Sequence, residues 1–162
     1  MGVVIDGLLW LAALGNGLVG GLFFAFSTFI MRALANLPQD KGVSAMVEIN
    51  RVILRSLFMP LFVGTTLASA ALAVIGALHM GEPGSVLMLI GGVSYVVGMF
   101  LCTMVLNVPL NNELDRVDPA GAVAGPVWAR YLERWTVWNH VRTLASLLAS
   151  ALFIGALLSA QA

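Results

Sequence analysis

Four long apolar stretches, separated by three more polar connections, organise this sequence. About 20 helical residues cross the ~30 Å hydrocarbon core of a bilayer, and each stretch is close to or above that length. The pattern therefore predicts an all-α integral membrane protein, a four-helix bundle that forms one domain over residues 1–162. The expected spans are residues 8–31, 57–78, 86–106 and 143–159.

The three connections differ in character. Residues 79–85 form a short turn rich in Gly and Pro, which are turn-forming residues. The other two connections, residues 32–56 and 107–142, are polar, and each ends in a segment without Gly or Pro that leads into the next span. We therefore expect the second and fourth helices to extend beyond the membrane.

Composition indicates that the protein lies in a membrane, and the distribution of charge predicts its orientation there. Hydrophobic residues make up 60% of the chain and charged residues only 10%, against about half and a quarter in soluble domains. All eight Lys and Arg residues lie in the two longer connections, and basic loops stay in the cytoplasm. The sequence thus predicts an inner-membrane protein with these loops on the cytoplasmic side and both termini outside. The net charge of zero gives no indication of a nucleic-acid partner.

A distinctive stripe of residues begins ahead of the fourth span. Its members recur at three- and four-residue steps, so they share one face of a helix. An interfacial belt, in which Trp and Tyr rings sit at the level of the lipid headgroups, is one interpretation. A binding site is the other, favoured slightly because Asn and Arg alternate with the rings. The stripe consists of Trp128, Tyr131, Trp135, Trp138, Asn139 and Arg142.

Three further polar groups are candidates to join this stripe, and each has a structural alternative. The group after the third span contains a proline that should kink or stop the helix, with Asn side chains as caps or ligand contacts. The group before the second span is a solvated charged face unless Asn50 or Arg51 turns inward. The group in the first span either holds neighbouring helices together by polar contacts or forms the floor of a pocket. Their members are Asn107, Pro109, Asn111 and Asn112; Glu48, Asn50, Arg51 and Arg55; and Asn16, Gly20, Phe23, Phe24 and Ser27.

Oligomerisation and metal binding have weaker signals. Gly17 and Gly21 have the GxxxG spacing, which favours close packing within the monomer and leaves a homodimer possible. The two histidines, His79 and His140, are expected on opposite sides of the membrane, and no HExxH or ExxH motif is present. We therefore expect no metal, whereas a bound haem or quinone remains an open alternative.

Four segments resemble the anthrone oxygenase-like family of small membrane proteins, many of which are known only as a domain of unknown function. The resemblance implies an oxygenase that converts an anthrone to an anthraquinone with molecular oxygen and without metal or flavin. The matching motif positions are Asn107, Pro109, Leu110, Asn111, Trp135, Trp138, Asn139 and Arg142, with a weaker match at Asn50. The segments are GGLFFAFSTFIMRAL (Gly20–Leu34), INRVI (Ile49–Ile53), TMVLNVPLNNEL (Thr103–Leu114) and WTVWNHVRTLAS (Trp135–Ser146).

This chemistry suggests roles for the candidate residues. An anthrone is a carbon acid whose enolate can pass an electron to oxygen, so the protein need only remove a proton, hold the anion and exclude water. Arg142 would stabilise the oxyanion, and Asn107, Asn111 and Asn139 would donate hydrogen bonds. His140 is the candidate base, with Glu48 in reserve. Residues expected to contact the substrate are Trp135, Trp138, Asn50, Trp128, Tyr131 and Phe24.

Two functions therefore remain. The first is a cofactor-independent oxygenase or related redox enzyme, acting at the cytoplasmic membrane face on a planar aromatic, anthrone- or quinol-like substrate. The second is a non-enzymatic quinone-, haem- or lipid-binding membrane protein or accessory subunit. The same pocket would suit both, because Arg, Asn and Trp bind an oxygenated ring whether or not it reacts.

Overall fold

The computed structural model describes residues 2–159, and within this range it contains helices and no strand. The predictions of one domain over residues 1–162 and of both termini outside the cell also involve residue 1 and residues 160–162. These residues lie outside the part of the chain that the structure describes. α-Helices alternate with three short π-helical segments, labelled η. In chain order the elements are α1 (Val3–Ala25), η1 (Phe26–Ile30), α2 (Met31–Ala35), α3 (Gln39–Ile53), α4 (Phe58–Leu78), α5 (Ser85–Val93), η2 (Ser94–Leu101), η3 (Thr103–Asn107), α6 (Val108–Asp115) and α7 (Ala124–Ser159).

Four helices are long and apolar enough to cross a membrane: Val3–Ala35, Phe58–Leu78, Ser85–Asp115 and Ala124–Ser159. Large apolar side chains also cover their outer surfaces, as Leu67 and Leu144 illustrate at 66% and 69% exposure. Lipid would cover such surfaces without the free-energy cost of contact with water. The prediction of an all-helical chain with four helices able to span a membrane is confirmed.

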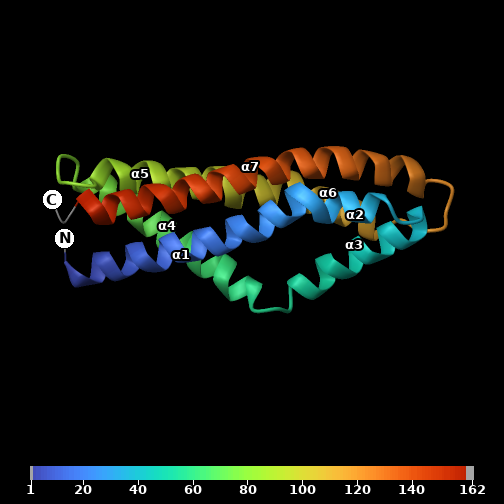
Figure 1. Cartoon of the computed structure of the whole chain (residues 1–162), viewed down its shortest axis with the longest axis horizontal. Coiled ribbons are helices and arrows are strands. Elements are labelled where there is room, and N and C mark those ends of the chain that lie inside the picture. The colour runs from blue at the N-terminus through green and yellow to red at the C-terminus, as the bar shows by residue number, and fades with distance from the viewer. Residues whose placement is uncertain (1, 160–162) are drawn as a thin grey trace.

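α7 runs along one side of the bundle over nearly its whole length (Figure 1). α1 packs along it, α5 lies beside its second half, and α4 packs mainly on α5. The contact between α4 and α5 is close because glycines stand at the crossing. A Cβ added to Gly92 would lie 2.3 Å from the Ser69 carbonyl oxygen, and one added to Gly76 would lie 2.5 Å from the Ser85 carbonyl oxygen.

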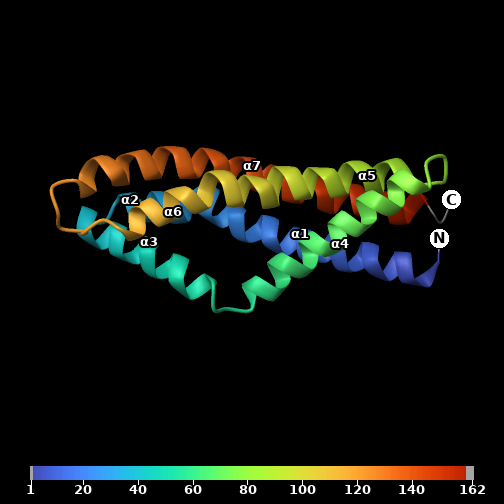
Figure 2. The same ribbon diagram turned by 180° about the vertical axis from the view of Figure 1, so that it is seen from behind.

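The predicted extension of the second span is instead a separate helix. α3 ends at Ile53, and α4 begins at Phe58 after a turn that we call the elbow (residues 54–57). Figures 1 and 2 both show the elbow standing away from the other helices. The Ser56 hydroxyl donates to the Ile53 carbonyl at 2.8 Å and accepts from the Phe58 amide at 3.2 Å, replacing helical bonds. Pro60 supplies no N–H and suits the first turn of a helix, so α4 starts afresh here.

The third span continues further than predicted. The helix does not stop at Pro109 but runs to Asp115, and only residues 116–123 form the loop before α7. η3 lies immediately before α6, so the helix accommodates Pro109 by changing its hydrogen-bonding pattern one turn earlier. The fourth span is one uninterrupted helix with its predicted extension, since Pro126 falls in the first turn of α7.

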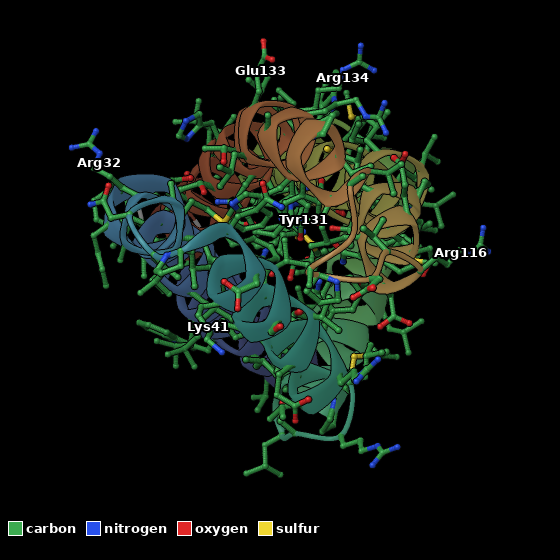
Figure 3. All side chains as sticks on the ribbon, turned by 90° about the vertical axis from the view of Figure 1, so that its right-hand side faces the viewer. Arg32, Lys41, Arg116, Tyr131, Glu133 and Arg134 are labelled. Atoms are coloured by element: carbon green, nitrogen blue, oxygen red, sulfur yellow. The ribbon has the colours of Figure 1, made fainter. Side chains whose placement is uncertain are left out.

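The two ends of the bundle differ. The start of α1, the end of α7 and the α4–α5 turn lie at one end, and the α2–α3 and α6–α7 connections lie at the other (Figure 1). We call the second of these the loop end. Viewed from it, Arg32, Arg116 and Arg134 point outward, whereas Tyr131 lies between the helices (Figure 3). These three charged residues therefore lie around an interior that contains Tyr131 of the aromatic stripe.

Candidate functional site

The aromatic stripe of α7 faces the interior of the bundle. Trp128, Tyr131 and Trp135 are at most 5% exposed. Their rings stack in order, with centroids 5.7 Å apart between Trp128 and Tyr131 and 5.8 Å apart between Tyr131 and Trp135. An interfacial belt requires rings that face lipid, so that interpretation does not fit these three residues. Trp138, by contrast, is half-buried and lines neither of the two cavities described below.

Arg142 is a buried cation at the inner end of this stripe. It is 4% exposed, and its guanidinium lies over the rings of Phe23 and Trp135, at 4.2 Å and 4.9 Å from their centroids. Its Nη2 donates to Asn139 Oδ1 at 2.7 Å, and its Nη1 is 3.5 Å from Thr103 Oγ1. Nε has no hydrogen-bond partner. No carboxylate within residues 2–159 forms an ion pair with this side chain.

Asn139 fixes the position of Arg142. Its Nδ2 donates to the Phe23 carbonyl and to Ser27 Oγ, both at 2.7 Å. Its Oδ1 is therefore oriented toward the guanidinium. Both acceptors come from the α1–η1 segment, so Asn139 links that segment to the α7 cation. These hydrogen bonds use the Asn139 side chain for positioning, and it does not line the cavity described below.

The asparagines around Pro109 divide between two environments. Asn107 is fully buried and donates through Nδ2 to the Trp135 carbonyl at 3.2 Å, while its Oδ1 has no partner. Asn111 accepts a 2.8 Å hydrogen bond from the Tyr131 hydroxyl. That hydroxyl in turn lies 3.4 Å from Asn50 Nδ2. Tyr131 thus connects α3, α6 and α7.

A cavity of about 270 Å³, which we call the inner cavity, lies against Arg142 and Trp135. This volume is close to the lower limit of small-molecule sites, ~300 Å³. Its walls are mostly apolar. The lining residues are Phe23 and Phe26; Met46, Val47, Ile49, Asn50, Arg51, Ile53 and Leu54; Phe58, Met59 and Phe62; Thr103, Met104, Val108, Asn111, Asn112 and Asp115; and Trp135 and Arg142.

Four of the residues predicted to act in catalysis or to contact the substrate line the inner cavity: Arg142, Asn111, Trp135 and Asn50. Phe23, Arg51 and Asn112, members of the three further candidate groups, line it as well. The remaining predicted residues lie elsewhere. Trp128 and Tyr131 form the buried stack behind it, Asn107 and Asn139 are used in interhelical bonds, and Trp138 lies outside it. His140 is exposed, and Phe24 is 54% exposed on the outer face of α1.

Neither predicted base lines the inner cavity. His140 points away from it, one residue round the helix from Asn139. Glu48 lines a different cavity. The carboxylate that lines the inner cavity is that of Asp115, and it accepts a 2.8 Å hydrogen bond from Arg51 Nη2. Asp115 was missed in the sequence because the helix was expected to end near Pro109.

Two other residues that line the inner cavity, Thr103 and Met104, were also not predicted from the sequence. Thr103 and Met104 fall in η3, where a π turn shifts the side chains relative to an α-helical register. Within residues 2–159, no group of three or more His, Cys, Asp and Glu side chains could hold a metal ion. The donors on the cavity wall are instead guanidinium, amide and hydroxyl groups, which suit oxygen atoms of an organic ligand.

The comparisons with known proteins agree with the resemblance seen in the motifs. A family model described as "Anthrone oxygenase" matches residues 51–152, which is more than half of the chain. The match includes Thr103, Asn111, Asp115, Trp135 and Arg142 of the inner cavity. No curated protein and no solved structure matches the chain.

Proposed function

The chain belongs to the anthrone oxygenase family, and on that premise we propose that it is a membrane-embedded oxygenase whose inner cavity binds a planar aromatic, anthrone- or quinol-like substrate. The observation that carries this proposal is the state of Arg142, which is buried and forms no ion pair with a carboxylate within residues 2–159. A buried cation is costly unless an opposite charge compensates it. An enolate oxygen would supply that charge.

The cavity's other surfaces suit the rest of such a substrate. Phe23, Phe26 and Trp135 present rings on which a flat molecule can stack. The unpartnered Trp135 Nε1 is a further N–H donor beside Arg142. Apolar walls exclude water, which strengthens the interaction between the guanidinium and an oxyanion.

The proposed reaction needs no redox cofactor because the substrate supplies the electrons. Loss of a proton from the anthrone methylene gives an enolate, whose oxygen lies at Arg142. The enolate transfers an electron to O₂, the two radicals combine at carbon, and the hydroperoxide formed loses water to leave the second ketone. The balance is one anthrone and one O₂ to one anthraquinone and one water. We assign proton removal to Asp115, which fills the role first considered for His140.

The charge distribution supports an orientation for this site. Basic residues of the first and third connections favour the cytoplasmic side, and Arg32, Arg116 and Arg134 lie around the loop end (Figure 3). We therefore propose that the inner cavity opens near the cytoplasmic membrane face and that the ends of α1 and α7 face outward.

The direct test is oxygen consumption by the purified protein in phosphatidylcholine nanodiscs supplied with anthrone. We expect O₂ uptake above the autoxidation seen with heat-denatured protein, and one ¹⁸O atom from ¹⁸O₂ in the anthraquinone by mass spectrometry. Arg142→Met should abolish the excess rate, whereas Arg55→Met, which alters a residue outside the cavity lining, should retain it. Tight binding of anthrone without any excess O₂ uptake would favour the non-enzymatic binding protein instead.

A further inference from the structure

A second cavity lies next to the inner one, on the side where α3 faces α1. Its volume is about 710 Å³, and it is the more open of the two. We call it the outer cavity. Nearly all of its surface is apolar, contributed by Leu22, Phe26 and Ile30 on one side and by Ile49, Val52 and Ile53 on the other. Its size and openness suit a flat hydrophobic molecule better than a few water molecules.

The two cavities share one wall. Phe26, Ile49, Ile53 and Phe58 line both of them. None of these side chains can form a hydrogen bond, so packing alone holds the wall in place. A single layer of apolar side chains therefore separates the outer cavity from the cavity that contains Arg142.

α3 is anchored to the bundle on the side opposite the outer cavity. Its polar contacts run from Asn50 to Tyr131 and from Arg51 to Asp115, toward α7 and α6. The elbow that follows α3 stands apart from the other helices (Figure 2). Rotation of the Ile49 and Ile53 side chains would therefore break no hydrogen bond or ion pair found among residues 2–159.

The outer cavity is positioned to open toward lipid. α4 has 21 residues, about the number that crosses the ~30 Å hydrocarbon core, so Phe58 should lie at the edge of that core. The neighbouring Leu57 is 87% exposed and Leu54 is 64% exposed. Such side chains at the elbow suit contact with acyl chains. Planar aromatic molecules concentrate in this interfacial region, as Trp and Tyr rings do.

We propose that the outer cavity is an access site that takes up the neutral planar aromatic substrate from the bilayer, and that the shared wall is its passage to the inner cavity. The identity of the substrate rests on the proposed function. Glu48 is the ionisable residue in the lining of the outer cavity, and its carboxylate would repel an anion. The outer cavity therefore favours the neutral form of the substrate over the enolate. Deprotonation then belongs to the inner cavity, where Arg142 lies.

The test uses 9,10-anthraquinone, a neutral planar ketone, added to the protein in phosphatidylcholine nanodiscs. Stopped-flow quenching of tryptophan fluorescence follows its arrival, because Trp135 lines the inner cavity. Ile53→Phe should thicken the shared wall and slow both association and dissociation about tenfold while changing the Kd less than about threefold. Ile53→Ala should accelerate both steps, so the proposal does not depend on how well one variant folds.

Val63→Phe is the matched control, because Val63 lies on the same helix as Phe58, is 45% exposed and lines neither cavity. It should leave both rates unchanged. Wild-type rates in Ile53→Phe and Ile53→Ala, or a change confined to dissociation, would show that Ile53 does not separate the two cavities and would overturn the proposal. Absence of quenching in the wild-type protein would instead reject the inner binding site and the proposed function with it.

Discussion

Arg142 is the residue whose surroundings are hardest to explain by folding alone. Buried arginines usually pair with carboxylates, yet this guanidinium has an amide oxygen, a distant hydroxyl and two ring faces as its neighbours. Cation–π contacts of this kind contribute about 2 kcal/mol or more when desolvated, less than the several kcal/mol that burial of an ion costs. A bound anion would make up the difference.

Supplying a carboxylate within the protein should therefore weaken anion binding. Thr103 Oγ1 is 3.5 Å from Arg142 Nη1, so Thr103→Asp would place a negative charge beside the guanidinium. We expect the Kd of 9-anthracenecarboxylate, measured by fluorescence titration, to rise more than about tenfold, since loss of a charged interaction costs ~1.5–3 kcal/mol. Thr103→Asn has nearly the same shape without the charge and should change the Kd much less. Equal Kd values for the two variants would contradict this role of Arg142.

Asp115 is expected to act on the rate of reaction rather than on binding. Asp115→Asn removes the proposed base, and loss of general-base catalysis typically costs about 10²–10⁴ in rate, so kcat for anthrone oxidation should fall by that order. The Kd of anthraquinone should stay close to the wild-type value. Arg51→Met provides the control, because it removes the ion pair but keeps the carboxylate. An equal loss of kcat in both variants would show that the reaction depends on the ion pair between Arg51 and Asp115 and not on proton removal by Asp115.

Four predicted residues line the inner cavity, Asn50 on α3, Asn111 on α6, and Trp135 and Arg142 on α7, and the pair on α7 follows most directly from the sequence. Trp135 and Arg142 are seven apart on α7, and an uninterrupted helix brings both to the same cavity. Thr103 and Asp115 were missed because their positions depend on a π segment and on a helix that continues past Pro109. Asn107 was expected either to cap the helix or to donate a hydrogen bond to the substrate, but it donates to the Trp135 carbonyl, a backbone group of another helix that leaves no signature in the sequence.

At the level of elements, the glycines that matter are not those of the GxxxG pair. A Cβ at Gly21 would have no neighbour within 4 Å, and one at Gly17 would make an ordinary contact. Gly76 and Gly92 instead allow α4 and α5 to approach each other. A spacing motif within one helix carries no information about which helix packs against it, so sequence alone could not select these two.

Gly92→Ala should therefore destabilise the bundle. Its Cβ would clash with the Ser69 carbonyl and with Ala73, and overpacking of this kind costs about 1–3 kcal/mol. We expect a lower Tm in detergent by differential scanning fluorimetry. Gly64→Ala is the comparison, because no atom lies within 4 Å of the added Cβ and Ala has the higher helix propensity. A Tm for Gly92→Ala as high as that for Gly64→Ala would mean that α4 and α5 are less closely packed.

The elbow illustrates how local chemistry can override an apolar pattern. The segment before the second span has no Gly or Pro, so a continuous helix was expected. The break depends on Ser56, which bonds the last carbonyl of α3 and the first amide of α4, and on Pro60 four residues later. These are helix-start signals, and they place the shared wall of the two cavities next to a turn.

On the scale of the whole molecule, orientation can be tested directly. In a background with Cys102 replaced by Ala, we expect Ala120→Cys in the α6–α7 loop to resist a membrane-impermeant maleimide on intact cells and to react after lysis. Glu82→Cys in the α4–α5 turn should react on intact cells. The reverse pattern would place the basic loops outside and overturn the proposed topology.

The 36 residues of α7 form one rod, about 54 Å long at ~1.5 Å per residue, although the hydrocarbon core is only ~30 Å thick. Arg142 and Trp135 are rigidly connected to the part of this rod that lipid holds in place. A thicker or thinner bilayer would therefore raise or lower the cavities relative to the headgroups without any change in their shape. We expect acyl-chain length, compared across nanodiscs of different phosphatidylcholines, to control how readily dissolved substrate reaches the protein, so that the membrane itself sets part of the rate.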